Sequence, residues 1–128
     1  MAVRITLWVL RVCVLLTLIL GIVFWAGDIA AIVPIHMLLG ILVVLSLWVL
    51  AVETAMAKGG NWGLSGGAFV LGIIIVAFGL RQASILPTSS LHWIIQVIHL
   101  LLGLSAAGMG EALAGRYKRA NTTRTATA

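Results

Sequence analysis

The amino-acid sequence predicts an all-α integral membrane protein, built as a bundle of four helices. Of its 128 residues, 62% are hydrophobic and only 9% are charged, and the mean hydropathy is +1.22. A soluble domain has about a quarter of its residues charged, so this chain has too little polar surface to coat a globule in water. Its four long apolar stretches are each near the ~20 residues that a helix needs to cross the hydrocarbon core of a bilayer.

The four predicted spans cover residues 5–25, 33–57, 62–80 and 90–114. Together they form one bundle domain over residues 1–115, and a polar tail rich in Thr and Ala follows over residues 116–128. We expect this tail to be disordered and cytoplasmic. The alternation over about ten residues that marks membrane β-strands is absent. Because the connections are short, consecutive helices should be antiparallel neighbours in up-down-up-down order.

Several residues mark the ends of these spans. The pair Gly27-Asp28 separates the first span from the second. Pro34 fits the first turn of the second span, where its missing N–H costs nothing. Either Ser89 or Ser90 is expected to cap the fourth helix, because a serine oxygen can accept a hydrogen bond from an unpaired N–H of the first turn.

The basic residues predict the orientation of the bundle. One end holds seven of the eight, namely Arg4, Arg11, Lys58, Arg116, Lys118, Arg119 and Arg124, and the other end holds only Arg81. Positive residues stay in the cytoplasm, so we expect both termini inside and a bacterial inner (plasma) membrane as the location. The net charge of +5 then orients the bundle and is no sign of nucleic-acid binding.

A short pattern occurs twice, on the second and fourth spans. His36 is followed by Gly40, and His99 is followed by Gly103, so that each span carries His-x-x-x-Gly. These two spans run in the same direction. The pattern therefore indicates two related helix hairpins about a pseudo-two-fold axis.

The paired histidines predict a cofactor. Two imidazoles that face each other across a bundle can ligate a haem iron from both sides. A glycine one turn after each histidine leaves room for the flat porphyrin. We therefore expect one haem b, with His36 and His99 as axial ligands and with Gly40 and Gly103 beside the ring. The alternative is structural: the histidines hydrogen-bond between helices and the glycines permit close packing.

Two other residues at the outer end are candidate contacts of the same cofactor. His92 is the alternate second ligand, because its depth, counted from the basic residues, matches that of His36 better than the depth of His99 does. Otherwise His92 binds a haem propionate, accepts a proton from a quinol, or simply contacts water. Arg81 either pairs with the propionates or ends a solvated loop.

The remaining polar and small residues have structural interpretations. Arg11 is expected to pair with Glu53 or Glu111, since an ionisable group within a span needs a partner. Gly72 and Gly79 are seven residues apart and share a helix face. Close approach of a neighbouring helix is the favoured reason for that face, and a flat cofactor lying against it is the alternative.

The sequence resembles the four-helix membrane cytochromes b, such as cytochrome b561-type proteins and the haem-bearing anchors of respiratory dehydrogenases. The segments from His36 to Gly40 and from His99 to Gly103, within four spans, carry this resemblance. It implies haem b held by two histidines, and electron exchange with a quinol or a redox protein, in an oligomer or a larger complex. Many such proteins hold two haems, but this chain has no histidine in its cytoplasmic half, so one haem is expected.

Other functions remain open at this stage. Motifs of soluble enzymes are absent, so an electron carrier is favoured over a self-contained enzyme. The alternatives are a non-redox structural or accessory membrane subunit, and a small transporter that binds its substrate at the outer polar residues.

Overall fold

A computed structural model of the chain describes residues 1–27, 30–57, 59–85 and 91–126, without the side chains at positions 30, 83 and 122–126. The expectations for Asp28, for Lys58 and for the capping residue Ser89 or Ser90 lie outside the described residues. So does the side chain of Arg124.

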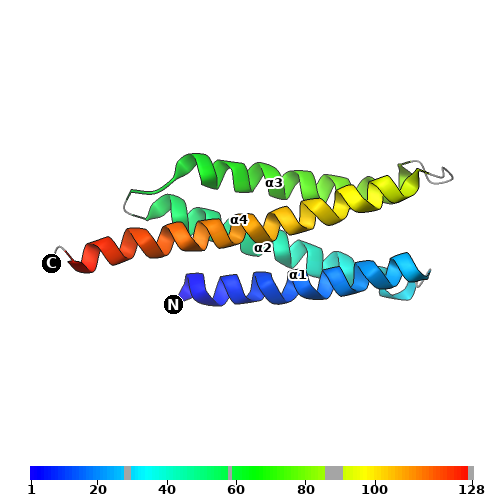
Figure 1. Cartoon of the computed structure of the whole chain (residues 1–128), viewed down its shortest axis with the longest axis horizontal. Helices are drawn as coiled ribbons and strands as arrows, with labels where there is room; N and C mark the ends of the chain where they lie inside the picture. Colours follow the sequence, from blue (N-terminus) through cyan, green and yellow to red (C-terminus); the bar gives the residue numbers. More distant parts are fainter. Residues whose placement is uncertain (28–29, 58, 86–90, 127–128) are drawn as a thin grey trace.

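The described residues form an all-α bundle of four long helices and no strands. The helices are α1 (Ala2–Ala26), α2 (Val33–Met56), α3 (Trp62–Arg81) and α4 (His92–Ala126), with short 3-10 turns η1 (Ala30–Ile32) and η2 (Gln82–Ser84). Each of the four is long and apolar enough to cross a membrane. They lie lengthwise against one another in up-down-up-down order, with both chain ends at the same end of the bundle (Figure 1). The predicted fold class is confirmed.

Helices α2 and α4 form the centre of the bundle. Each contacts both α1 and α3, and they also contact one another. At the centre lie four fully buried leucines, Leu10, Leu47, Leu50 and Leu113. The hydroxyl of Thr54 donates to the carbonyl of Leu50 at 2.8 Å and to that of Leu113 at 3.2 Å, so one side chain joins α2 to α4.

Close approach of α2 and α3 depends on Gly72. A Cβ at this position would lie 2.9 Å from Cε2 of Trp48 and 3.0 Å from Cγ1 of Val44, and it would also collide with Nε1 of Trp48. Real Cβ contacts are almost never so short. The interpretation of this glycine as a point of close helix approach is confirmed, since the indole of Trp48 occupies the space that a side chain would need.

The start of α2 agrees with the prediction from its proline. The helix begins at Val33 and Pro34 lies in its first turn. There the backbone nitrogen has no helical carbonyl to bond, so that proline is tolerated.

The end of α4 differs from the prediction. The helix does not stop near Ala114 but continues to Ala126, so the expectation of a disordered tail is wrong for residues 116–126. The segment after Gly115 contains no proline and no further glycine, and Arg, Lys and Ala are good helix formers. Polarity alone suggested disorder there, but nothing in these residues breaks a helix that the bundle has already nucleated.

Candidate functional site

His36 and His99 lie against one another near the outer end of the bundle. His36 is in the first turn of α2, and His99 is in the second turn of α4. Their ring centroids are 6.1 Å apart, and the ring planes are tilted by 46°. Both side chains are partly buried. The Nδ1 atom of each ring is buried and has no hydrogen-bond partner among the described residues. The structure therefore brings together the two histidines of the repeat.

A phenylalanine flanks each histidine. The ring of Phe24, from α1, meets that of His36 edge-on, with centroids 5.4 Å apart. The ring of Phe78, from α3, is nearly parallel to that of His99, at 6.1 Å and 13°. One ring from each of the four helices thus forms a continuous aromatic group. The sequence analysis missed both phenylalanines. Their position near the outer ends of α1 and α3, level with the histidines, was the signal available.

Two glycines, one on α1 and one on α3, leave space for the histidine rings. A Cβ on Gly79 would lie 3.3 Å from Cε1 of His99, and one on Gly21 would lie 4.0 Å from Cε1 of His36. The shared face of Gly72 and Gly79 therefore meets a bulky ring at both positions, that of Trp48 and that of His99. Gly21 was not singled out from the sequence.

The glycines of the repeat face open space. A Cβ on Gly40 or on Gly103 would have nothing within 4 Å apart from the helix's own neighbouring backbone. The alternative in which these two glycines permit close helix packing is therefore wrong. They leave space on α2 and α4, one turn beyond each histidine.

His92 has a different environment from the histidine pair. It is the first residue of α4, and its Nδ1 lies 3.2 Å from the carbonyl oxygen of Ile85. The residue of α4 whose ring contacts that of His36 is His99. Because an α-helix rises about 1.5 Å per residue, His92 lies roughly 10 Å further out along α4 than His99. Between the two possible partners of His36, the geometry favours His99.

Arg81 lies in the last turn of α3 and is exposed. The hydroxyl of Ser84 donates to its backbone carbonyl at 2.8 Å, which closes the turn into η2. The side chain of Arg81 is therefore at the same end of the bundle as the histidine pair.

Arg11 pairs with Glu111, one of its two expected partners. Its Nε donates to Oε1 at 2.6 Å and an Nη donates to Oε2 at 2.9 Å, which joins α1 to α4. The guanidinium also lies 5.3 Å from the ring centroid of Trp8. The side chains of Arg11 and Glu111 are 43% and 48% exposed, so this pair faces outward from the bundle. Glu53 is elsewhere, with Oε2 buried and unpartnered.

The ligand set limits which metals could bind. Among the described residues, no group of three or more His, Cys, Asp or Glu side chains could hold a metal ion. A structural zinc ion needs about four protein ligands. Haem iron needs only axial ligands from the protein, since the porphyrin supplies the others. A pair of imidazoles is therefore a donor set suited to haem.

The chain matches no family model, no curated protein and no solved structure to which it was compared. The resemblance to membrane cytochromes b stays a prediction, and a function has to be argued from the side chains themselves.

Proposed function

We propose that the protein is a membrane cytochrome that binds one haem b through His36 and His99 and takes part in electron transfer. The observation that carries the proposal is the contact between these two rings, from α2 and α4, near the outer end of the bundle. The resemblance of the repeat to that of membrane cytochromes b supports the same function.

The spacing of the rings is compatible with two ligands on one metal. An imidazole nitrogen binds a transition metal at about 2 Å, and the ring centroid lies about 1 Å behind that nitrogen. Two rings on opposite sides of one iron would therefore have centroids about 6 Å apart. The centroids of His36 and His99 are 6.1 Å apart. The distance between the two rings is therefore in the range expected for two ligands of one metal.

The unpartnered nitrogens also favour a ligand. A buried polar atom without a hydrogen bond costs about 1–3 kcal/mol. Both Nδ1 atoms of the pair are in this state. A metal bound between the two rings would remove the energetic penalty of these unpartnered nitrogens, which the protein alone bears at both histidines.

The surrounding side chains have roles in holding the pair. Phe24 and Phe78 cover the histidine rings from α1 and α3 and keep water from them. Gly21 and Gly79 leave the space in which the rings lie. When bound, haem b supplies a one-electron couple between ferrous and ferric iron. Because the two histidines would fill both axial positions, we propose an electron carrier and not an enzyme that binds substrate at iron.

We infer that both termini are in the cytoplasm and that the histidine pair lies in the outer half of a bacterial inner membrane. Within the described residues, the basic side chains at the end shared by the termini are Arg4, Arg11, Arg116, Lys118 and Arg119, and Arg81 is at the other end. Cytoplasmic ends of spans are rich in Lys and Arg. A quinol or a redox protein that meets the outer half would then be the electron partner, and Arg81 and His92 lie where they could contact haem propionates or that partner.

The absorption spectrum tests the haem proposal. Purified protein, produced with ample porphyrin supply, should show a Soret band that shifts on reduction with dithionite. His36→Ala and His99→Ala should each abolish this spectrum. His92→Ala is the matched control, since it removes a histidine from the same helix as His99, and it should retain the bands. A colourless wild-type protein, or bands that survive both substitutions in the pair, would contradict the proposal.

A second candidate function is a non-redox accessory subunit of a larger membrane complex. The half-exposed pair of Arg11 and Glu111 favours it, because charges that face hydrocarbon are costly unless something covers them. This function predicts a colourless protein that co-purifies with other membrane subunits. The same spectrum therefore separates the two candidates.

A further inference from the structure

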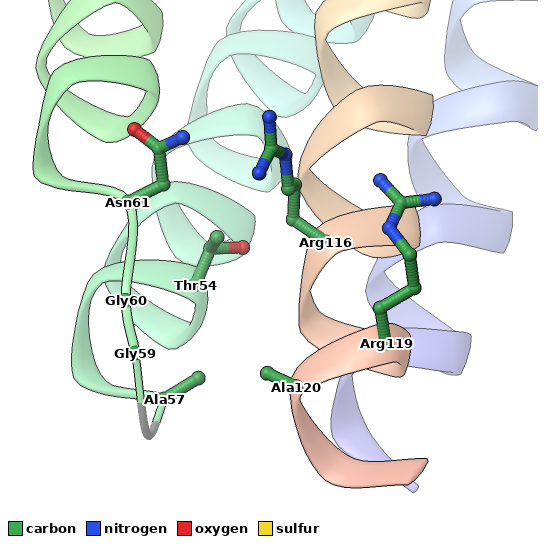
Figure 2. Close-up of a pocket in the computed structure, with 8 residues that line it drawn as sticks. All are labelled: Thr54, Ala57, Gly59, Gly60, Asn61, Arg116, Arg119 and Ala120. Carbon is green, nitrogen blue, oxygen red and sulfur yellow. The ribbon is translucent and has the colours of Figure 1, made fainter. Parts of the chain in front are cut away.

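A polar pocket lies at the opposite end of the bundle from the histidine pair. It is a cavity of about 280 Å³ between the end of α2, the loop that leads into α3, and α4 (Figure 2). Arg116 and Arg119 line it from α4, and Asn61 lines it from the loop. The haem proposal makes no use of this pocket.

The lining of the pocket is positively charged. Arg116 and Arg119 are three residues apart on α4, so their backbone positions are neighbours on the helix surface. Figure 2 shows the guanidinium of Arg116 reaching from α4 toward Asn61, and that of Arg119 running alongside α4. The absence of a side chain at Gly115 makes room for Arg119, since a Cβ there would lie 3.6 Å from its Nη1. No carboxylate is among the described residues that line this pocket.

The side of the pocket formed by the loop before α3 supplies a hydrogen-bond donor. Asn61 caps α3: its Oδ1 accepts a hydrogen bond from the N–H of Leu64 at 2.9 Å. Its amide nitrogen is directed toward α4 (Figure 2). α3 begins directly after Asn61, so the positive end of its dipole lies beside the pocket. Thr54 also lines the pocket, but its hydroxyl proton is already directed to helix carbonyls, so Asn61 is the neutral side chain available as a donor.

The loop backbone holds this side of the pocket close to α2. Gly59 has φ +74°, a left-handed conformation that favours glycine. A Cβ on Gly60 would collide with the carbonyl of Ala55, so the chain passes directly over the end of α2. These two glycines let the chain turn from α2 to α3 in a short distance and place Asn61 opposite Arg116 (Figure 2).

We propose that this pocket binds a phosphate group, supplied by the headgroup of an anionic phospholipid. Guanidinium groups bind phosphate oxygens through paired hydrogen bonds, and a helix N-terminus favours an anion. The pocket lies where α2 ends and α3 begins, which is the level of the lipid headgroups for spans of this length. Basic pockets between membrane helices on the cytoplasmic side are sites of this kind. Free phosphate offers the same oxygens and is distinguished by experiment.

Lipid titration of the full chain in neutral detergent tests the proposal. Thermal unfolding, followed by tryptophan fluorescence, is measured against added short-chain phosphatidylglycerol, phosphatidylcholine or inorganic phosphate. Phosphatidylglycerol should raise the midpoint, because a ligand that binds only the folded state stabilises it. Phosphatidylcholine, which carries no net charge, should raise it less. A rise with inorganic phosphate equal to that with phosphatidylglycerol would assign the site to the free anion and overturn the lipid source.

Charge-removing variants show where the lipid binds. Arg116→Gln and Arg119→Gln should each weaken the apparent affinity for phosphatidylglycerol by about fivefold, and the double variant by about 30-fold. Lys118→Gln is the matched control: it removes the same charge between the two arginines in sequence, from a position that is exposed as theirs are but does not line the pocket. It should weaken the affinity clearly less than either arginine variant, because Lys118 is not a lining residue of the pocket.

The proposal is overturned if Lys118→Gln weakens binding as much as either arginine variant, since binding would then reflect general surface charge. It is also overturned if wild type shows no preference for phosphatidylglycerol over phosphatidylcholine. Should the double variant not be recovered folded, the two single variants carry the same comparison with Lys118→Gln.

Discussion

Replacing Gly72 with alanine should destabilise the bundle, although alanine is the better helix former. The new methyl group would lie 2.9 Å from Cε2 of Trp48 and 3.0 Å from Cγ1 of Val44. Trp48 cannot easily withdraw, because its ring is stacked on that of Phe69 with centroids 5.5 Å apart. Forcing an added methyl group into a packed interior costs about 1–3 kcal/mol.

Gly66→Ala is the matched control for this prediction. Gly66 is also inside α3, but it is exposed and an added Cβ would have no neighbour within 4 Å apart from the helix's own neighbouring backbone. Both substitutions gain the same intrinsic helix propensity, up to about 1 kcal/mol. The difference between them therefore isolates the close approach of α2 and α3. We expect the free energy of unfolding of Gly72→Ala to be about 1–3 kcal/mol below that of Gly66→Ala.

The assay is reversible unfolding of the two variants in mixed micelles of neutral detergent and dodecyl sulfate, followed by tryptophan fluorescence and by circular dichroism. The free energies are compared at one micelle composition. If Gly72→Ala is as stable as Gly66→Ala, or more stable, then the contact between Gly72 and Trp48 does not limit the approach of α2 to α3, and the packing argument is refuted.

Three other predictions concern the core, the histidine pair and the orientation. Thr54→Val keeps the shape of the side chain but removes its hydrogen bonds to the carbonyls of Leu50 and Leu113, so the free energy of unfolding in the same assay should fall by about 1 kcal/mol, and an unchanged value would show that the hydroxyl group adds nothing. Gly79→Val adds atoms where a Cβ already lies 3.3 Å from Cε1 of His99, so the variant should retain several-fold less haem per protein than wild type, and full haem content would contradict the placement of the ring. A fluorescent protein fused after Ala128 should fluoresce and alkaline phosphatase fused there should be inactive, whereas active phosphatase would place the C-terminus outside the cytoplasm.

The sequence was sufficient for the fold because membrane spans are defined by length and hydropathy. The four helices begin and end within a few residues of the predicted limits, apart from the end of α4. There the polar composition was mistaken for disorder. Composition reports whether a segment can remain in lipid, but a helix can extend into water when no residue terminates it.

The histidine pair could be predicted because a repeat relates its two members. The depth argument that favoured His92 depended on treating Lys58 and Arg116 as markers of one level. Since α4 continues well past Arg116, a basic residue on that helix does not mark the end of the span. Which of His99 and His92 contacts the ring of His36 could therefore be decided only from the structure.

The phenylalanines and glycines around the histidines could not be predicted, because each helix is apolar on all sides. In a soluble bundle a polar face shows which side of a helix points outward. Here large hydrophobic side chains lie on the exposed surface, as Ile19 and Ile73 do, and also in the core. Hydropathy therefore does not show which side of each helix faces the core. Which ring contacts which histidine depends on that rotation.

The extension of α4 makes the C-terminal end of the protein stiff. Its 35 residues correspond to about 52 Å of helix, whereas the hydrocarbon core of a bilayer is about 30 Å thick. The last eleven residues, Arg116 to Ala126, would form a rod about 16 Å long that continues the axis of the span. A label attached near Ala126 would move together with the helix. A small tilt of α4 in the membrane would therefore produce a larger displacement of the label outside it.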